Sequence, residues 1–139
     1  MSTSLSPYIS FRGVAREAME FYRSVFGGEL QSSTFADFPM PGVDPADDDL
    51  VMHSQLTTPG GLILMGSDTP PSMDYDDGAR ITVALFGDDA AELSTQFDAL
   101  AEGGSVSMPL SDSPWGDRFG MLVDRYGVGW MVNIGPASS

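Results

Sequence analysis

The sequence contains no cysteine and no lysine. The absence of cysteine excludes disulfides, zinc–thiolate sites and cysteine nucleophiles, and it fits the reducing cytoplasm in which we expect the protein to act. Positive charge is scarce, because six arginines stand against 20 acidic residues and the formal net charge is -14. Such an acidic surface repels phosphate groups, so we expect neither nucleic acid nor a membrane surface as a partner.

The sequence also lacks an apolar run close to the roughly 20 residues of a membrane-spanning helix. Phosphate-binding loops, nucleophile elbows and calcium-binding loops are missing too, so the chemistries that depend on them are not indicated. The 139 residues suit a single domain over residues 1–139. A domain of this length buries roughly two-thirds of its unfolded surface, so it needs no disulfide or metal to fold.

Hydrophobic periodicity and turn residues predict the same order of elements, β-α-β-β-β, in each half of the chain. Each predicted helix ends at a glycine pair, Gly27-Gly28 or Gly103-Gly104, which suits the left-handed C-cap conformation. Asp88 and Asp89 precede the second helix and are expected to cap it. The first half has predicted strands at 7–12, 29–36, 50–57 and 62–66 around a helix at 14–26. The second half has predicted strands at 79–86, 105–110, 117–124 and 128–134 around a helix at 90–102.

The spacing of matched residues indicates that the two halves are a duplicated unit. The glycine pairs at 27–28 and 103–104 are 76 residues apart, and Met65 and Met131 are 66 apart. The other matched pairs are Phe21 with Phe97, 76 residues apart, and Gly61 with Gly127, 66 apart. A period with matched turn residues is typical of an internal repeat, and we place the two modules at about 5–68 and 79–135.

Several of these segments resemble a known family. The residues R-E-A-M-E-F-Y at 16–22, followed by V-F-G-G at 25–28, resemble the first helix of the vicinal oxygen chelate superfamily, which includes glyoxalases, bleomycin-resistance proteins and extradiol dioxygenases. The segments that are similar to the PhnB-like branch of this superfamily are V-M-H at 51–53, L-M-G-S-D at 64–68, W-G-D-R-F-G at 115–120, D-R-Y-G at 124–127 and W-M-V-N at 130–133. The resemblance covers nearly the whole chain.

The resemblance implies an α+β fold of two tandem βαβββ modules, in which a curved mixed sheet surrounds a cavity and the helices cover its outer face. It also implies a homodimer. Metal-using members place one ligand on the first and one on the last strand of each module, and these positions fall here at Pro7 or Tyr8, Met65, Thr82 and Met131. These side chains suit no hard divalent cation, so we expect no metal and no cofactor. Met65 and Met131 are interpreted as core residues, with a two-methionine copper site as the alternative.

Six residues are candidates for contacting a ligand. His53, the single histidine, is expected to share a strand face with Val51 and Gln55, where it either exchanges protons and hydrogen-bonds a ligand or serves the structure alone. Trp115 suits stacking on a planar ligand and Arg118 suits pairing with an anion, with a loop position and a salt bridge as the respective alternatives. The apolar candidates, which line a cavity or belong to the core, are Tyr8, Phe86 and Met65.

Two functions follow from these observations. The first is a PhnB-like family protein that binds a small apolar or aromatic molecule in its cavity without the usual metal. The second is a metal-dependent lyase, isomerase or dioxygenase of the same superfamily with non-standard ligands, such as His53 with a nearby carboxylate. A methyltransferase is disfavoured, because no glycine-rich nucleotide loop follows the first predicted strand.

Overall fold

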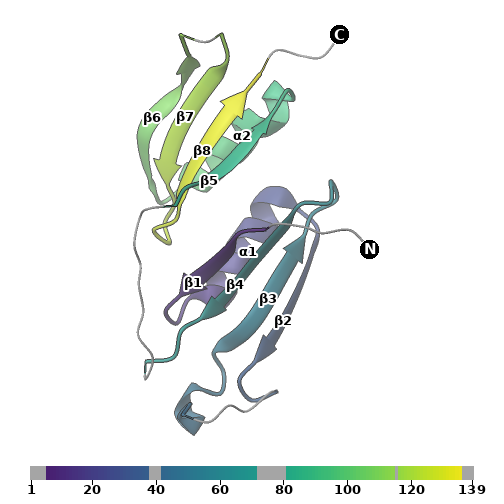
Figure 1. Cartoon of the computed structure of the whole chain (residues 1–139), viewed down its shortest axis with the longest axis vertical. Helices are drawn as coiled ribbons and strands as arrows, with labels where there is room; N and C mark the ends of the chain where they lie inside the picture. Colours follow the sequence, from purple (N-terminus) through teal and green to yellow (C-terminus); the bar gives the residue numbers. More distant parts are fainter. Residues whose placement is uncertain (1–5, 38–41, 72–80, 115, 136–139) are drawn as a thin grey trace. The chain divides into compact units, whose positions relative to one another are not determined.

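The computed structural model describes residues 6–37, 42–71, 81–114 and 116–135. The chain forms two compact units, Met1–Asp77 and Gly78–Ser139. In the described residues, each unit holds one four-stranded sheet and one α-helix that lies against a face of that sheet (Figure 1). The start of the strand predicted at 79–86 lies outside the described residues.

The first unit follows the predicted order of elements. They are β1 (Tyr8–Phe11), α1 (Ala15–Phe26), β2 (Glu29–Thr34), β3 (Val51–Thr57) and β4 (Ile63–Asp68). The strands lie in the order β1-β4-β3-β2, with β1 parallel to β4 and the other neighbours antiparallel. In the described part of the loop between β2 and β3, Pro45–Asp47 forms a 3₁₀ turn, which begins where the Asp44 carboxylate accepts a hydrogen bond from the Ala46 amide.

The second unit repeats this arrangement. Its elements are β5 (Val83–Gly87), α2 (Ala90–Ala101), β6 (Ser105–Asp112), β7 (Arg118–Val123) and β8 (Gly129–Ile134). The strand order is β5-β8-β7-β6, and β5 is parallel to β8. The predicted α+β fold of two βαβββ halves is therefore confirmed. Each half has its own four-stranded sheet, and neither sheet closes on itself.

Strand pairing reproduces the two offsets of the predicted repeat. Tyr8 pairs with Met65 in the first unit, and Ala84 pairs with Met131 in the second. The first residues of these pairs are 76 positions apart and the second residues are 66 apart. The hairpin of β3 and β4 ends at residue 68 and that of β7 and β8 at residue 134, again 66 positions later. The same backbone pattern therefore occurs twice.

The helices of the two units correspond at a different offset from the predicted one. They begin 75 residues apart, at positions 15 and 90. At this offset buried Tyr22 matches buried Phe97, whereas Phe21 is half-buried. The predicted match of Phe21 with Phe97 is therefore wrong by one position. The cause is Glu102, an extra residue between α2 and its glycine pair that α1 does not have.

The glycine pairs after the helices have two separate physical roles. The first glycine of each pair takes a positive φ, 74° after α1 and 78° after α2, a conformation that side chains disfavour. The second glycine lies against a neighbouring strand. A Cβ atom at Gly28 would collide with the Thr57 carbonyl oxygen, and one at Gly104 would collide with that of Val123. Both positions of each pair therefore require glycine.

Each helix buries its apolar stripe against its own sheet, and a carboxylate satisfies its first turn. The Asp68 carboxylate accepts a hydrogen bond from the Ala15 amide at the start of α1, and the Asp89 carboxylate caps α2 through the Glu92 amide. The predicted capping role of Asp89 is thus confirmed. The fully buried core residues with the largest side chains are Trp130, Tyr22, Phe11, Met19, Leu56, Leu100 and Leu122. Among the described residues, no helix combines the length and the apolar character that crossing a lipid bilayer requires.

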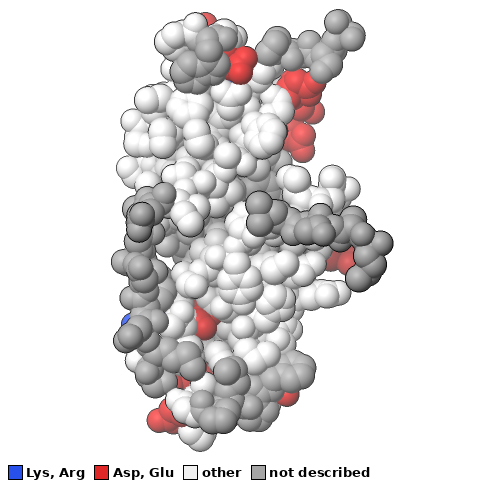
Figure 2. Space-filling view, in the orientation of Figure 1, with Lys and Arg blue, Asp and Glu red and all other residues white. Residues whose placement is uncertain are grey.

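The second face of each sheet carries no helix from the described residues of its own unit, and we call it the open face. Side chains alternate between the two faces of a strand. In β4, buried Leu64 and Gly66 face α1, whereas half-buried Met65 and Ser67 lie on the open face. Each helix lies behind its sheet in Figure 1. Figure 2, in the same orientation, shows that most of the described surface over the sheets carries no charged residue.

Candidate functional site

The open face of the first sheet carries Tyr8 and His53 side by side. Tyr8 Oη lies 3.4 Å from His53 Nδ1, and the two rings stack with their centroids 5.8 Å apart. Tyr8 is 49% exposed and His53 is half-buried. The strand register pairs Tyr8 with Met65, and Met65 with Gln55. Three of the predicted ligand contacts, Tyr8, His53 and Met65, therefore lie on one sheet face.

A β-bulge changes the predicted position of Val51. The pairing of β2 with β3 slips by one residue between Val51 and His53. The extra residue breaks the alternation of side chains, so Val51 is buried while His53 and Gln55 are half-buried. The prediction that Val51 shares a face with His53 and Gln55 is therefore wrong. The Val51 amide donates instead to the buried Asp68 carboxylate on the side of α1.

The resemblance assigns the metal ligands of other superfamily members to Pro7 or Tyr8, Met65, Thr82 and Met131. In the structure Tyr8 lies opposite Met65, Ala84 lies opposite Met131, and Thr82 directly precedes β5. A neutral phenol, two thioethers, a methyl group and a neutral hydroxyl do not fit a hard divalent cation. Within the described ranges, no three His, Asp or Glu side chains gather in a way that would hold a metal ion.

The open face of the second sheet carries three methionines in one cross-strand row. Met108 on β6 pairs with Met121 on β7, which pairs with Met131 on β8. We call these three residues the methionine row. Met108 is 44% exposed, and the other two are half-buried. The corresponding row of the first sheet is Gln31, Gln55, Met65 and Tyr8. Gln31 and Gln55 of the first unit thus correspond to the thioethers Met108 and Met121 of the second, whereas Met65 and Met131 are methionines in both.

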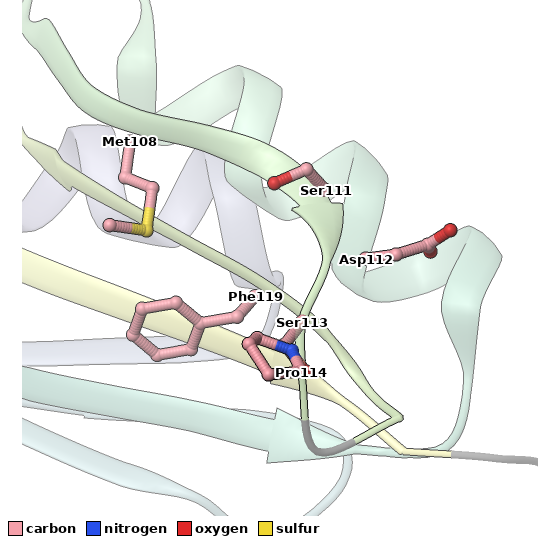
Figure 3. A pocket seen from close by; sticks show the side chains of 6 residues that line it. All are labelled: Met108, Ser111, Asp112, Ser113, Pro114 and Phe119. Atoms are coloured by element: carbon pink, nitrogen blue, oxygen red, sulfur yellow. The ribbon is translucent and has the colours of Figure 1, made fainter.

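A pocket of about 200 Å³ lies next to the methionine row and shares Met108 with it. It is lined by Met108, Ser111, Asp112, Ser113, Pro114 and Phe119. Figure 3 shows Met108 and Ser111 on one side of the pocket and Phe119 and Pro114 on the other. The Asp112 side chain extends away from Met108 and Phe119. The space between these walls is therefore mainly apolar, with the Ser111 hydroxyl as a polar group at its side.

The loop between β6 and β7 is held in place by Ser113 and Asp117. Ser113 Oγ donates to the Asp117 carbonyl oxygen at 2.7 Å and accepts from the Asp117 amide at 3.1 Å. The Asp117 carboxylate accepts from Asn133 Nδ2 at 2.9 Å, which ties the loop to β8. These bonds position Pro114 at the pocket. Trp115, predicted to stack on a ligand, lies outside the described residues.

Arg118 and Phe86 do not line the pocket. Arg118 is exposed, and its side chain makes no hydrogen bond or ion pair with the described residues. It pairs with buried Ile134, so the alternation of β7 places it on the side of α2, whereas Phe119 lies on the open face. Phe86 is 78% exposed on the open face, opposite Asn133. The structure therefore separates these two predicted contacts from the pocket residues.

The sequence-based prediction did not include the pocket lining. Met108 lies in β6, whose pairing with β7 slips twice, so a regular alternation cannot assign its face. Phe119 gives a clearer signal, because Phe119 and Met121 alternate with buried Gly120 and Leu122 along β7. Both faces of β7 are therefore apolar at these positions. An apolar open face indicates that it, too, has an apolar environment or ligand.

Two carboxylates from the resemblance motifs stabilise the fold, each within its own unit. Asp68 is 5% exposed and accepts from the Ala15 amide at 2.9 Å and the Val51 amide at 3.0 Å. Asp124 is 3% exposed and accepts at both of its oxygens. Its donors are the amides of Tyr126 and Val128 and the indole Nε1 of Trp130. These motif positions are explained by hydrogen bonds within each unit.

Comparison with known proteins places this geometry in context. Residues 5–132 match the sequence model of the Glyoxalase/Bleomycin resistance protein/Dioxygenase superfamily. Protein YjdN from Escherichia coli (strain K12) is 29% identical over 140 residues, which span 94% of each chain. The match extends over both units, as the predicted resemblance requires.

Two solved structures are similar over almost the whole chain. The protein PA1353 from Pseudomonas aeruginosa is 40% identical with a TM-score of 0.87, over 98% of this chain and 100% of that chain. A protein from Bacillus cereus, described as a putative 3-demethylubiquinone-9 3-methyltransferase, PhnB protein, is 28% identical with a TM-score of 0.74, over 96% and 100%. The predicted superfamily, with a PhnB-like structural neighbour, is confirmed.

Proposed function

The chain belongs to the glyoxalase/bleomycin resistance protein/dioxygenase superfamily, and we propose that it binds a small apolar or aromatic molecule in the pocket between Met108 and Phe119. The observation that carries this proposal is the apolar lining of that pocket on an open sheet face. The proposal includes no divalent metal, because the residues at the ligand positions that the resemblance assigns lack suitable donor atoms.

The size of the pocket limits the ligand. Its volume of about 200 Å³ is below the roughly 300–1,000 Å³ of sites for drug-sized molecules. It therefore suits one ring or a short aliphatic group of a ligand. Phe119 offers a ring and Met108 a thioether, and both attract aromatic rings. The Ser111 hydroxyl can orient such a ring through one hydrogen bond.

Further ligand contacts are proposed on other parts of the chain. Tyr8 and His53 present a hydroxyl and an imidazole on the open face of the first sheet, where both suit hydrogen bonds to a polar ligand group. Trp115 directly follows the pocket residue Pro114, which favours a stacking role. Phe86 offers an exposed ring, and Arg118 offers a guanidinium without a partner among the described residues.

We also propose that the protein is a cytoplasmic homodimer. The absence of cysteine supports the compartment, and the family resemblance supports the dimer. Light scattering after size-exclusion chromatography measures the mass in solution. A mass equal to that of one chain would contradict the dimer.

A screen of small aromatic fragments tests the proposed pocket. A fragment that binds only the folded protein raises its melting temperature. Because Trp130 is buried at 1% exposure and hydrogen-bonded, we assign a ligand-dependent change in tryptophan emission to Trp115, and Trp115→Phe removes that change. We expect Phe119→Ala to weaken binding about fivefold, because it removes an aromatic contact worth about 1 kcal/mol.

Val106→Ala is the matched control for this screen. Val106 lies on the same strand as Met108 and is 43% exposed, but it does not line the pocket. We expect this variant to bind fragments as the wild type does. The proposal is contradicted if no fragment raises the melting temperature, or if Phe119→Ala binds as tightly as the wild type. Stoichiometric nickel, zinc, manganese or iron in protein purified without chelators would support the metal-dependent alternative instead.

A further inference from the structure

The methionine row has a regular geometry that its sequence positions do not reveal. Met108, Met121 and Met131 come from three adjacent antiparallel strands and lie directly opposite one another. Met121 and Met131 alternate with the buried residues that face α2, and Met108 points into the pocket of the open face (Figure 3). The three thioethers therefore lie on the same face of the same sheet.

The spacing of the strands allows the three sulfur atoms to converge. Residues directly opposite each other on antiparallel strands have Cβ atoms roughly 4.5–5.5 Å apart. Three sulfurs that bind one ion at about 2.3 Å lie about 4 Å from each other in a trigonal arrangement. A methionine side chain has three rotatable bonds. Met108 and Met131 can therefore turn their sulfurs over central Met121.

The chemistry of thioethers selects soft ions. Cysteine and methionine sulfur prefer Cu(I), whereas hard divalent ions prefer carboxylates and imidazoles. This chain has no cysteine, so thioethers are its only soft ligands. Thioethers are neutral and cannot offset the charge of an ion, which favours a monovalent one because its burial costs less. The net charge of -14 attracts cations to the surface in general.

We infer that the methionine row, Met108, Met121 and Met131, is a binding site for a soft monovalent metal ion, Cu(I) or Ag(I), held by three thioether sulfurs. The site is distinct from the divalent site that the resemblance implies, because Met131 alone belongs to both sets of residues. The first sheet lacks such a site. Its equivalent row contains one methionine, Met65, between Tyr8 and Gln55.

Titration of the full chain with Ag(I) tests this inference. Ag(I) shares the soft-ligand preference of Cu(I) and keeps its oxidation state in air. The methionine methyl groups are labelled with carbon-13 and followed by NMR. We expect the signals of Met108, Met121 and Met131 to shift together and to saturate at about one ion per chain. The signal of Met65 should not follow that titration curve.

Substitution of the central ligand gives the sharper result. Met121→Leu keeps a similar side-chain volume and removes the sulfur that both other ligands adjoin, so we expect the affinity for Ag(I) to fall at least about tenfold. Met65→Leu is the matched control, because Met65 occupies the position in the first unit that Met131 occupies in the second. It should leave the affinity unchanged. Circular dichroism verifies that both variants are folded.

Several results would overturn the inference. One is an affinity of the protein for Ag(I) that is no higher than the affinity of free methionine in the same titration. Another is a triple variant, Met108→Leu with Met121→Leu and Met131→Leu, that binds Ag(I) as the wild type does. If His53→Ala lowered the affinity for Ag(I) as much as Met121→Leu does, the ion would be placed on the first unit instead. Binding of an aromatic fragment without binding of Ag(I) would reject this site and leave the proposed function intact.

Discussion

Asp124 is 3% exposed, and three N–H groups point at its carboxylate. Two of them are the amides of Tyr126 and Val128 in the turn between β7 and β8, and the third is the indole of Trp130 in the core. A carboxylate is well suited to this place, because an ionised one only accepts hydrogen bonds. One side chain therefore fixes both the turn and the orientation of the largest core residue.

Replacing this carboxylate by an amide tests its role. In Asp124→Asn one oxygen becomes an NH₂ group that must face another donor. We expect the free energy of unfolding to fall by about 2 kcal/mol, the cost of losing a charged acceptor at a buried site. Urea denaturation measures the change. Asp112→Asn, at an exposed position whose side chain extends away from Met108 and Phe119, should change stability by less than about 0.5 kcal/mol. Equal midpoints for the two variants would contradict this role.

Single residues also show which parts of the site were predictable. Tyr8, His53 and Met65 were correctly expected on strands, and pairing brings them to one face. Their mutual distance was not predictable, because it depends on the β1–β4 register between segments more than 50 residues apart. Met108 was missed, since slips in the pairing of β6 hide its face. Periodicity along one strand contains no information about such slips.

At the scale of elements, the glycine pair after each helix determines how the helix is connected to its sheet. Gly28 and Gly104 lie where a Cβ atom would meet the backbone of the strand that ends nearby. Backbone atoms, unlike the end of a flexible side chain, cannot move aside without disturbing the sheet. The close approach explains why the second glycine of each pair is needed even though the first one already ends the helix.

Substitution of these glycines should therefore strongly destabilise both units. We expect Gly28→Ala and Gly104→Ala each to lower the free energy of unfolding by at least about 3 kcal/mol, because overpacking against a backbone exceeds the usual cost of overpacking. Thermal and urea denaturation measure the loss. Gly60→Ala is the control, since a Cβ atom there would meet no atom within 4 Å. A stability of Gly28→Ala equal to that of Gly60→Ala would show that the α1–β3 contact is misplaced.

The order and bounds of the elements were largely predictable from the sequence. Strands β3, β4, β7 and β8 were expected within two residues of their observed ends, because alternating apolar residues and turn glycines mark them clearly. The helix offset was misjudged by one residue, since a glycine pair marks where a helix ends without fixing the rotation of its buried face. The bulge beside Val51 was missed because it arises from packing against α1 and Asp68.

At the scale of the whole molecule, the excess of acidic residues opposes folding. A net charge of -14 creates repulsion that is greatest in the compact state. We expect the melting temperature to rise between about 10 mM and about 1 M sodium chloride, because the screening length falls from about 30 Å to about 3 Å. Calorimetry measures the shift, with an uncharged osmolyte at equal osmolality as control. A melting temperature independent of salt would show that the acidic groups are too well separated to repel.

Along the strands of both sheets, outside the irregular stretches of β3 and β6, the residues that hold the helix in place and the residues that face outward occupy alternate positions. A change from glutamine to methionine at an outward position leaves the packing of the opposite side unaltered. A gene that carries two copies of this unit can therefore vary the outward residues of either copy without a loss of foldability. Gln31 and Gln55 in one copy and Met108 and Met121 at the equivalent pairing positions of the other show how an outward row can acquire a role in one copy while both copies keep the same strand pairing.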